Sequence, residues 1–146
     1  MSRFLANKFI LYSAILGFFG FLDSLYLTIL HYRNAIPPCT IHGCETVLTS
    51  VYSMIGPFPL ALFGALFYLT VIIVSFLIVV EGRKQFLKFF HFAVLVGFLV
   101  SVVLFLIQAL IIKSFCQYCL LSEVIATGLL MLSLLKLKQD KKANLQ

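Results

Sequence analysis

The chain has 146 residues, of which 62% are hydrophobic and only 11% are charged. Soluble domains have about 45–50% apolar and about 25% charged residues, so this composition excludes a soluble globular domain, a disordered chain and a nucleic-acid-binding module. The net charge of +6 is therefore interpreted as a signal for membrane orientation, and the length allows one integral membrane domain covering residues 1–146.

Four segments are long and apolar enough to be transmembrane helices, each of which needs about 20 mostly apolar residues. All four are rich in Leu, Ile, Val and Phe, and none alternates as a membrane β-strand does. The sequence therefore predicts an all-α membrane protein, a four-transmembrane-helix bundle followed by a basic cytoplasmic tail at 136–146. The predicted spans are 9–32, 57–80, 89–112 and 116–135.

The positive charges predict how the bundle is oriented in the cell membrane. Nine of the 11 Lys and Arg residues, Arg3 among them, lie beside the N-terminus, the second connection and the C-terminal tail, whereas Arg33 and Lys113 lie on the opposite side. Positive residues favour the cytoplasmic side, so both termini are expected there. The loop at 33–56 and the short connection at 113–115 then face outward.

The four cysteines form two local pairs on this predicted outer face, where disulfides persist. Cys39 and Cys44 lie in the long loop, and Cys116 and Cys119 open the last helix. A helix N-terminus stabilises a thiolate, and Lys113 adds a positive charge. The second pair therefore has the features of a redox-active centre.

Two dithiol pairs on one face offer a path for electrons by thiol–disulfide exchange. A soluble dithiol outside the cell would reduce the loop pair, which would reduce the helix pair. The sequence has no motif for haem, an iron–sulfur cluster or a dinucleotide. A lipid-soluble quinone entering between the helices is the expected electron acceptor, and no metal is expected in the site.

Other interpretations of the cysteines stay open. The loop pair has a C-x4-C spacing and could be a structural disulfide in a membrane scaffold. All four cysteines could instead hold zinc, with His42 nearby, although zinc would favour two C-x2-C elements. A zinc-dependent assembly factor or a small transporter would then be the function.

Two carboxyl groups inside the predicted spans are candidates for function, because intramembrane charges are costly. Glu123 follows Cys119 by four residues and shares its helix face, so it could relay protons to a quinone. Alternatively, it is an interfacial carboxyl paired with water or Lys113. Asp23 is expected to form a hydrogen bond between helices, with proton transfer as the alternative.

The segment 45–56 has apolar residues at the spacing of a short amphipathic helix lying in the membrane interface. This helix is expected in the first outer loop, where it could cap a quinone pocket. Phe63 is a candidate contact to the quinone, although packing residues have the same composition.

Several motifs resemble those of the vitamin K epoxide reductase family, in its bacterial or archaeal disulfide-forming branch without a fused thioredoxin-like domain. The resemblance covers about residues 10–135. The order of the two cysteine pairs distinguishes this family from the DsbB-type oxidases. The matching motifs are Ser24-Leu25-Tyr26, Cys39 and Cys44 followed by Val47 and Ser50, Gly56-Pro57-Phe58-Pro59-Leu60, Phe63-Gly64-Ala65-Leu66-Phe67-Tyr68 and Cys116-Gln117-Tyr118-Cys119.

The resemblance implies a bundle around a ubiquinone- or menaquinone-type quinone, with Cys116–Cys119 as the active-site disulfide. It also implies that Cys119 faces the quinone, that Cys39 meets a thioredoxin-like partner, and that Cys44 reaches Cys116. Ser50 matches a family Ser or Thr near the quinone head group.

The chain departs from the animal enzymes of this family at two positions, one of which is an Asn that bonds the quinone in those enzymes. Leu60 replaces an Asn and Glu123 replaces a Tyr, so epoxide reduction is not expected. The resulting prediction is a membrane thiol oxidoreductase that drives disulfide formation. Its partner is a separate exported thioredoxin-like oxidase, and its predicted quinone-binding residues are Ser50, Leu60, Phe63 and Glu123.

Overall fold

The fold comes from a computed structural model that describes residues 2–145. Side chains are described from Lys8 to Ala143 and at Leu145. The predicted unit 1–146 therefore extends beyond the described residues at each end, and the side chain of Arg3, which was counted for orientation, also lies outside them.

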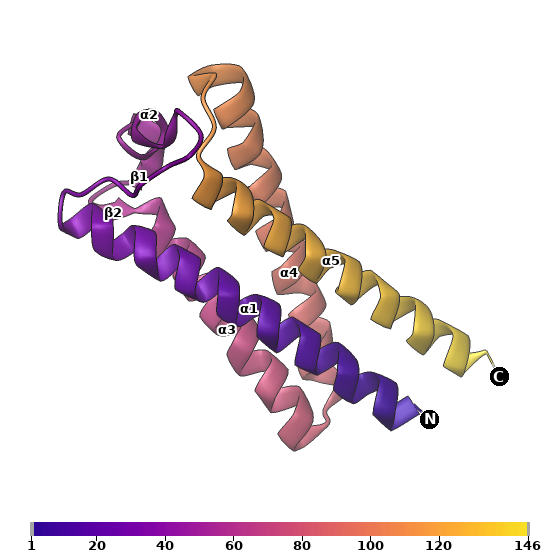
Figure 1. Ribbon diagram of the computed structural model, residues 1–146. Coiled ribbons are helices and arrows are strands. Elements are labelled where there is room, and N and C mark those ends of the chain that lie inside the picture. The colour runs from indigo at the N-terminus through magenta and orange to yellow at the C-terminus, as the bar shows by residue number, and fades with distance from the viewer. Residues whose placement is uncertain (1, 146) are drawn as a thin grey trace.

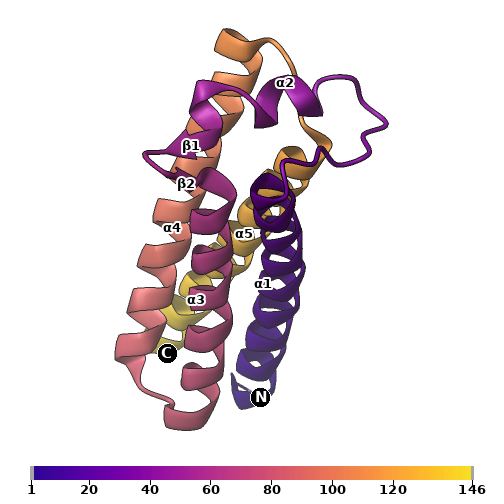
Figure 2. The same cartoon turned by 90° about the vertical axis from the view of Figure 1, so that its left-hand side faces the viewer.

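Four long helices form the bundle, which confirms the predicted fold class. They are α1 (Ser2–Tyr32), α3 (Leu60–Glu81), α4 (Lys84–Leu106) and α5 (Gln117–Asn144). Each contains a segment long and apolar enough to cross a membrane. Figures 1 and 2 show that both termini lie at one end of the bundle, whereas the connection between α1 and α3 lies at the other.

Three helix boundaries differ from the predicted spans. Helix α3 begins at Leu60 because the preceding prolines belong to a hairpin, and it ends at Glu81, where the C-cap residue Gly82 has a left-handed φ of 62°. Helix α4 begins after a two-residue link and includes Lys84 and Lys88, whose long side chains can reach polar surroundings from a helix. Helix α5 continues through the predicted tail, where Lys136 Nζ and Asp140 Oδ1 lie 2.8 Å apart one turn along the helix.

The first loop is more irregular than the helix predicted over 45–56. Helix α2 (Cys44–Leu48) has five residues and is followed by a 3₁₀ turn, η1 (Val51–Ser53). The hydroxyl groups of Thr49 and Ser50 donate to backbone carbonyls at 2.7 Å, which competes with helix continuation. The prediction was correct for the helix but wrong for its length.

A small antiparallel hairpin, which was not predicted, follows the 3₁₀ turn. Strand β1 (Met54–Ile55) pairs with β2 (Phe58–Pro59) through the two-residue connection Gly56-Pro57. Two-residue hairpin loops need a positive φ, and Gly56 has a φ of 61°. The hairpin leads directly into α3, with Pro59 at its N-cap.

The end of α4 widens into a π-helical segment, η2 (Ile107–Ile112). It ends at Lys113, whose φ of 54° is left-handed, and the chain then crosses to α5 in four residues. Such π segments occur mostly as short bulges, often at functional sites. In Figure 2, this end of α4 extends past the end of α3, beside the first loop.

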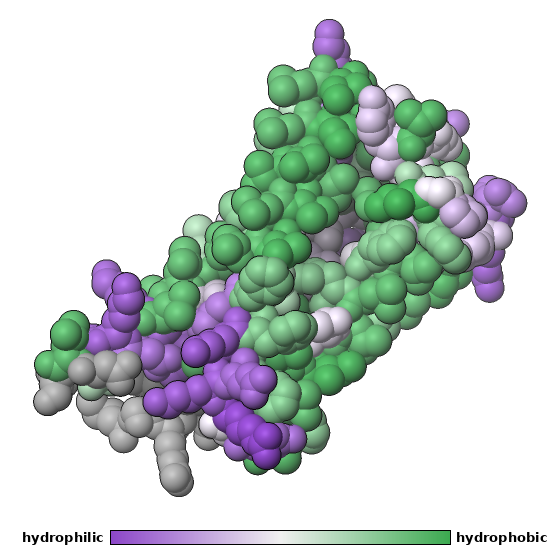
Figure 3. All heavy atoms as spheres, turned by 180° about the vertical axis from the view of Figure 1, so that it is seen from behind, coloured by the Kyte–Doolittle hydropathy of each residue, from purple (hydrophilic) through white to green (hydrophobic). Residues whose placement is uncertain are grey.

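The bundle core is filled near the termini and hollow near the first loop. Figure 3 shows apolar side chains over most of one face and hydrophilic ones gathered at the end that carries the termini, with a hollow among the apolar side chains. Such a surface suits a lipid environment. The buried apolar cluster consists of Phe9, Ile10, Tyr68, Val71, Val74, Phe90, Val94, Ile125 and Leu129.

Close packing of α1 against α3 leads to a test of the fold. A Cβ on Gly20 would lie 2.5 Å from Tyr68 Cε1, and the Tyr68 hydroxyl donates to Ser122 O at 2.7 Å. Because the ring is buried and tethered, Gly20→Ala should lower the free energy of unfolding in detergent by about 1–3 kcal/mol.

Gly128→Ala is the matched control. A Cβ on Gly128 would meet Leu16 Cδ1 at 3.4 Å, an ordinary contact. Alanine also favours the helix over glycine by about 0.5–1 kcal/mol, so this variant should be neutral or stabilised. Equal destabilisation of both variants in a chemical unfolding series would contradict the described packing of α1 on α3.

Candidate functional site

The structure brings the two cysteine pairs together at the end of the bundle opposite the termini. Cys39 and Cys44 form a disulfide with a Cα–Cα distance of 6.3 Å, whereas Cys116 and Cys119 are free thiols. Cys44, Val47 and Cys116 form one buried cluster, and Cys39 and Cys119 pack against it. Cys44 is only 1% exposed and Cys116 is fully buried, so water is excluded where the two pairs meet.

Cys116 occupies the N-cap of α5, as expected for a cysteine pair that opens the last helix. Its sulfur accepts a hydrogen bond from the backbone N–H of Cys119 at 3.4 Å. A hydrogen bond with the Cys119 side chain is the main cause that lowers the pKa of Cys116 below its usual value, with help from the backbone N–H groups of Cys119 and Tyr118. Burial opposes this shift. The arrangement favours the thiolate, which is the form that attacks disulfides.

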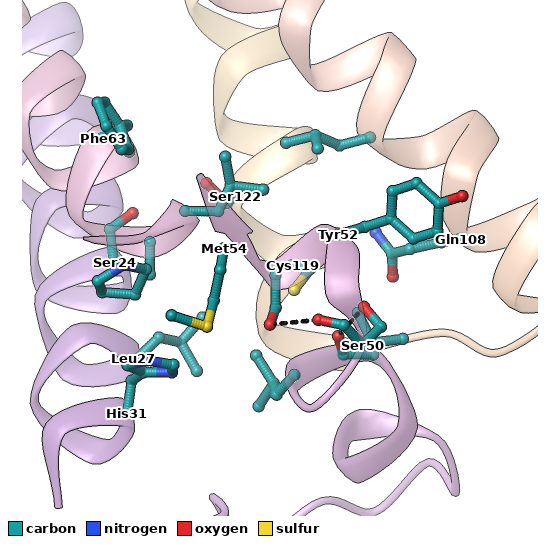
Figure 4. Close-up of a pocket in the computed structure, with 18 of the residues that line it drawn as sticks. Ser24, Leu27, His31, Ser50, Tyr52, Met54, Phe63, Gln108, Cys119 and Ser122 are labelled. Carbon is teal, nitrogen blue, oxygen red and sulfur yellow. Dashed lines mark hydrogen bonds between the residues drawn. The ribbon is translucent and has the colours of Figure 1, made fainter. Parts of the chain in front are cut away.

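A cavity of about 1030 Å³ lies next to the cysteine cluster, between helices α1, α3, α4 and α5. Among the described residues that line it, Cys119 is the one cysteine. Figure 4 shows Cys119 between Ser24 and Leu27 on one side and Gln108 on the other. The first loop covers the outer end of this cavity through residues of α2, η1 and β1, among them Ser50 and Met54.

All four predicted quinone-binding residues line this same cavity. They come from three separate parts of the chain, so their meeting is a property of the fold: Ser50, Leu60, Phe63 and Glu123. The Ser50 hydroxyl donates to Val47 O at 2.7 Å, so its lone pairs, not its proton, are left for a ligand. Their roles in binding stay predictions.

Gln108 connects the cavity to the cysteines, and sequence reasoning missed it. Its Nε2 donates to Glu123 Oε1 at 2.8 Å, and its Oε1 accepts the backbone N–H of Cys116 at 3.0 Å. Neither Lys113 nor any other described cation forms an ion pair with Glu123, so the alternative in which Lys113 pairs with this carboxyl is not found, and the proton-relay role stays a prediction. The sequence did contain a signal for this residue, because Gln108 is a polar amide within the uncharged, apolar span 89–112.

Asp23 and Ser24 bring polar groups to the cavity that have no hydrogen-bond partner within the described part of the chain. Asp23 is 8% exposed and its buried Oδ2 accepts no hydrogen bond, which contradicts the expected helix–helix hydrogen bond. The Ser24 hydroxyl, which faces the cavity in Figure 4, likewise makes no hydrogen bond to another described residue. A ligand with an apolar body and a few carbonyl groups binds in an apolar cavity that places a few polar side chains near those carbonyls. The residues present therefore fit a quinone.

The loop histidine does not join the cysteines in a larger polar site. His42 lies on the exposed surface of the loop between Cys39 and Cys44. Across residues 2–145, no group of three or more His, Cys, Asp or Glu side chains is placed to bind a metal ion.

The lowered pKa of Cys116 gives a direct test of the site. With the helix pair reduced, the ultraviolet absorbance of the Cys116 thiolate should appear with a midpoint at a pH below that of an ordinary cysteine. Cys119→Ala removes the main hydrogen-bond donor, so the midpoint should move to higher pH and the thiolate fraction at pH 7 should fall. Cys116→Ser serves as the blank. An unchanged midpoint in Cys119→Ala would contradict the described hydrogen bond.

Comparison with known proteins assigns the chain to a family. The sequence model of the vitamin K epoxide reductase family matches residues 11–134, which is most of the chain. No curated protein matches it. The chain therefore belongs to the vitamin K epoxide reductase family, and its family and four apolar helices make it a membrane thiol–disulfide oxidoreductase.

Proposed function

We propose that this member of the vitamin K epoxide reductase family oxidises the dithiol of a separate, exported thioredoxin-like protein and passes the electrons to a membrane quinone. Electrons would move from the partner to Cys39 and Cys44, then to Cys116 and Cys119, and then to the quinone. The net result is one disulfide in the partner and one hydroquinone in the membrane. The protein thereby drives disulfide formation outside the cytoplasm.

The observation that carries this proposal is the order in which the four sulfur atoms are placed. Cys44 and Cys116 share one buried cluster, and Cys119, one helical turn from Cys116, lines the cavity. Cys39 lies next to the exposed residues Pro38 and Thr40 and is itself partly exposed. This order runs from the surface through one buried cluster to the cavity, which supports an electron relay over a structural disulfide.

In the first exchange, a thiolate of the partner attacks Cys39 and displaces Cys44 as a thiolate. The second cysteine of the partner then attacks the partner's first cysteine, which is bonded to Cys39 in the mixed disulfide. This closes the disulfide of the partner and releases Cys39 as a thiolate. The partner leaves with a disulfide, and the loop keeps two electrons and a pair of thiols. The partly exposed Cys39 supports its role as the sulfur that meets the partner.

In the second exchange, the Cys44 thiolate attacks Cys116 in the oxidised helix pair. The Cys116–Cys119 bond breaks, and Cys119 leaves as a thiolate that faces the cavity. Cys39 then attacks Cys44, which restores the loop disulfide and releases Cys116. A thiol with a lowered pKa is a good leaving group, and the lowered pKa of Cys116 supports this last step.

The cavity residues would hold the electron acceptor beside Cys119. A bound ubiquinone- or menaquinone-type quinone supplies the capacity to take up two electrons and two protons. Ser24 has a free hydroxyl to donate to a carbonyl oxygen, and Phe63 and Leu60 supply apolar contacts. Glu123 can hold a proton near Cys119 while Gln108 fixes its carboxyl group.

The proposed orientation places both termini in the cytoplasm and both cysteine pairs on the outer, periplasmic or extracellular face. Nine of the 11 Lys and Arg residues favour it. The two termini lie at the same end of the bundle, opposite the first loop (Figure 2). A thioredoxin-like partner could then reach Cys39 without crossing the membrane.

An anaerobic assay tests the proposed function. The purified protein is mixed with a reduced thioredoxin-fold protein carrying a C-x-x-C pair and with a soluble quinone. Cys116→Ala and Cys119→Ala should each slow quinone reduction by at least about a hundredfold, because each removes a sulfur atom that the proposed relay needs. Quinone mixed with the reduced partner alone gives the background rate. Variants that reduce quinone as fast as the parent would refute the relay.

A further inference from the structure

The two residues between the helix cysteines both contact the loop that carries the other pair. Gln117 Oε1 accepts hydrogen bonds from the backbone N–H of Thr40 at 3.1 Å and from its hydroxyl at 2.7 Å. The Tyr118 hydroxyl donates to Pro38 O at 3.1 Å. Cys39 therefore lies between two residues that are tied to the Cys116-Gln117-Tyr118-Cys119 motif.

The loop also approaches the chain that leads into α5, immediately before Cys44. Gly43 has a φ of 141°, which side-chain-bearing residues rarely adopt. A Cβ at this position would lie 2.8 Å from Phe115 O and 3.1 Å from Phe115 N. The backbone at Gly43 thus packs directly on the residue that precedes Cys116. The loop is held on both sides of the disulfide.

Tyr118 is itself held in place from α1. Its ring lies against that of Tyr26, with ring centroids 5.6 Å apart. The hydrogen bonds of Gln117 and Tyr118 to the loop are exposed, so each contributes only modestly and can break and re-form. Such contacts suit a loop that must meet Cys116 in one step and a partner in another.

We propose that Gln117 and Tyr118 are positioning residues that dock the loop disulfide on the helix pair for thiol–disulfide exchange. The inference rests on the proposed function and deepens it, because it assigns a task to the two residues between the active-site cysteines. Bringing reacting groups together in the right geometry accounts for much of the rate of an intramolecular reaction. Loss of the docking contacts should therefore slow the meeting of Cys44 with Cys116.

A disulfide-trapping experiment measures this meeting without quinone or partner. In a full-length Cys39→Ser, Cys119→Ser background, diamide oxidises the two remaining thiols, and mass spectrometry follows the Cys44–Cys116 bond. Gln117→Leu removes two hydrogen bonds and should slow the initial rate about tenfold, whereas Tyr118→Phe removes one and should slow it about threefold.

Substitutions on the loop side distinguish docking from a general loss of structure. Thr40→Val loses the hydroxyl bond and should slow trapping about threefold, whereas Thr40→Ser keeps both donors and should trap at the parent rate. In the Gln117→Leu background, Thr40→Val should have no further effect, as expected for two residues that act through one contact. Thr46→Val, at an exposed loop position outside the contact, is the matched control and should also trap at the parent rate.

Trapping of Gln117→Leu at the parent rate would overturn the inference, as would a further threefold loss on adding Thr40→Val to it. Because the experiment needs neither quinone nor partner, its outcome is separate from that of the quinone assay. Slow trapping in the Gln117→Leu variant together with unaffected quinone reduction in Cys116→Ala would preserve the docking and refute the proposed relay.

Discussion

Contact between the first loop and the N-terminus of α5 is the constraint on which the rest of the site depends. Thiol–disulfide exchange requires sulfur atoms to approach one another closely, and loop positions 39 and 44 are more than 70 residues from the helix pair in sequence. The fold brings Cys44 and Cys116 into one buried cluster with Val47, which places the two pairs side by side. It also makes Cys116 inaccessible to water, so that exchange with the loop is favoured over reaction with solutes.

Because the bundle is packed unevenly, the cysteine cluster lies next to a cavity and not against a filled core. The half near the termini is filled by large side chains such as Phe90 and Leu129, whereas the half under the loop encloses the cavity. The π-helical end of α4 carries Gln108 to the boundary between cluster and cavity, where it contacts both Cys116 and Glu123. One amide thus couples the geometry of the thiol site to that of the cavity.

Much of this arrangement could be predicted from the sequence, because membrane helices leave a strong local signal. Apolar length identified the four spans, and the position of Cys116 at the start of a span placed it at a helix N-terminus. Contacts between segments that are distant in sequence could not be predicted from such local patterns. The role of Gln108 depends on how the end of α4 meets the start of α5, and that of Thr40 on where the loop meets α5. The hairpin at Gly56 depends on a turn that competes with helix formation.

The central claim, that the two cysteine pairs form one relay ending at a membrane quinone, is tested most directly by alkylation in native membranes. Membranes with and without quinone are supplied with a reduced thioredoxin-fold dithiol, and the thiols at all four cysteines are counted by mass spectrometry. The account predicts that all four cysteines become alkylated when quinone is depleted, and that quinone restores the disulfides. A loop disulfide that stays oxidised in depleted membranes would contradict it.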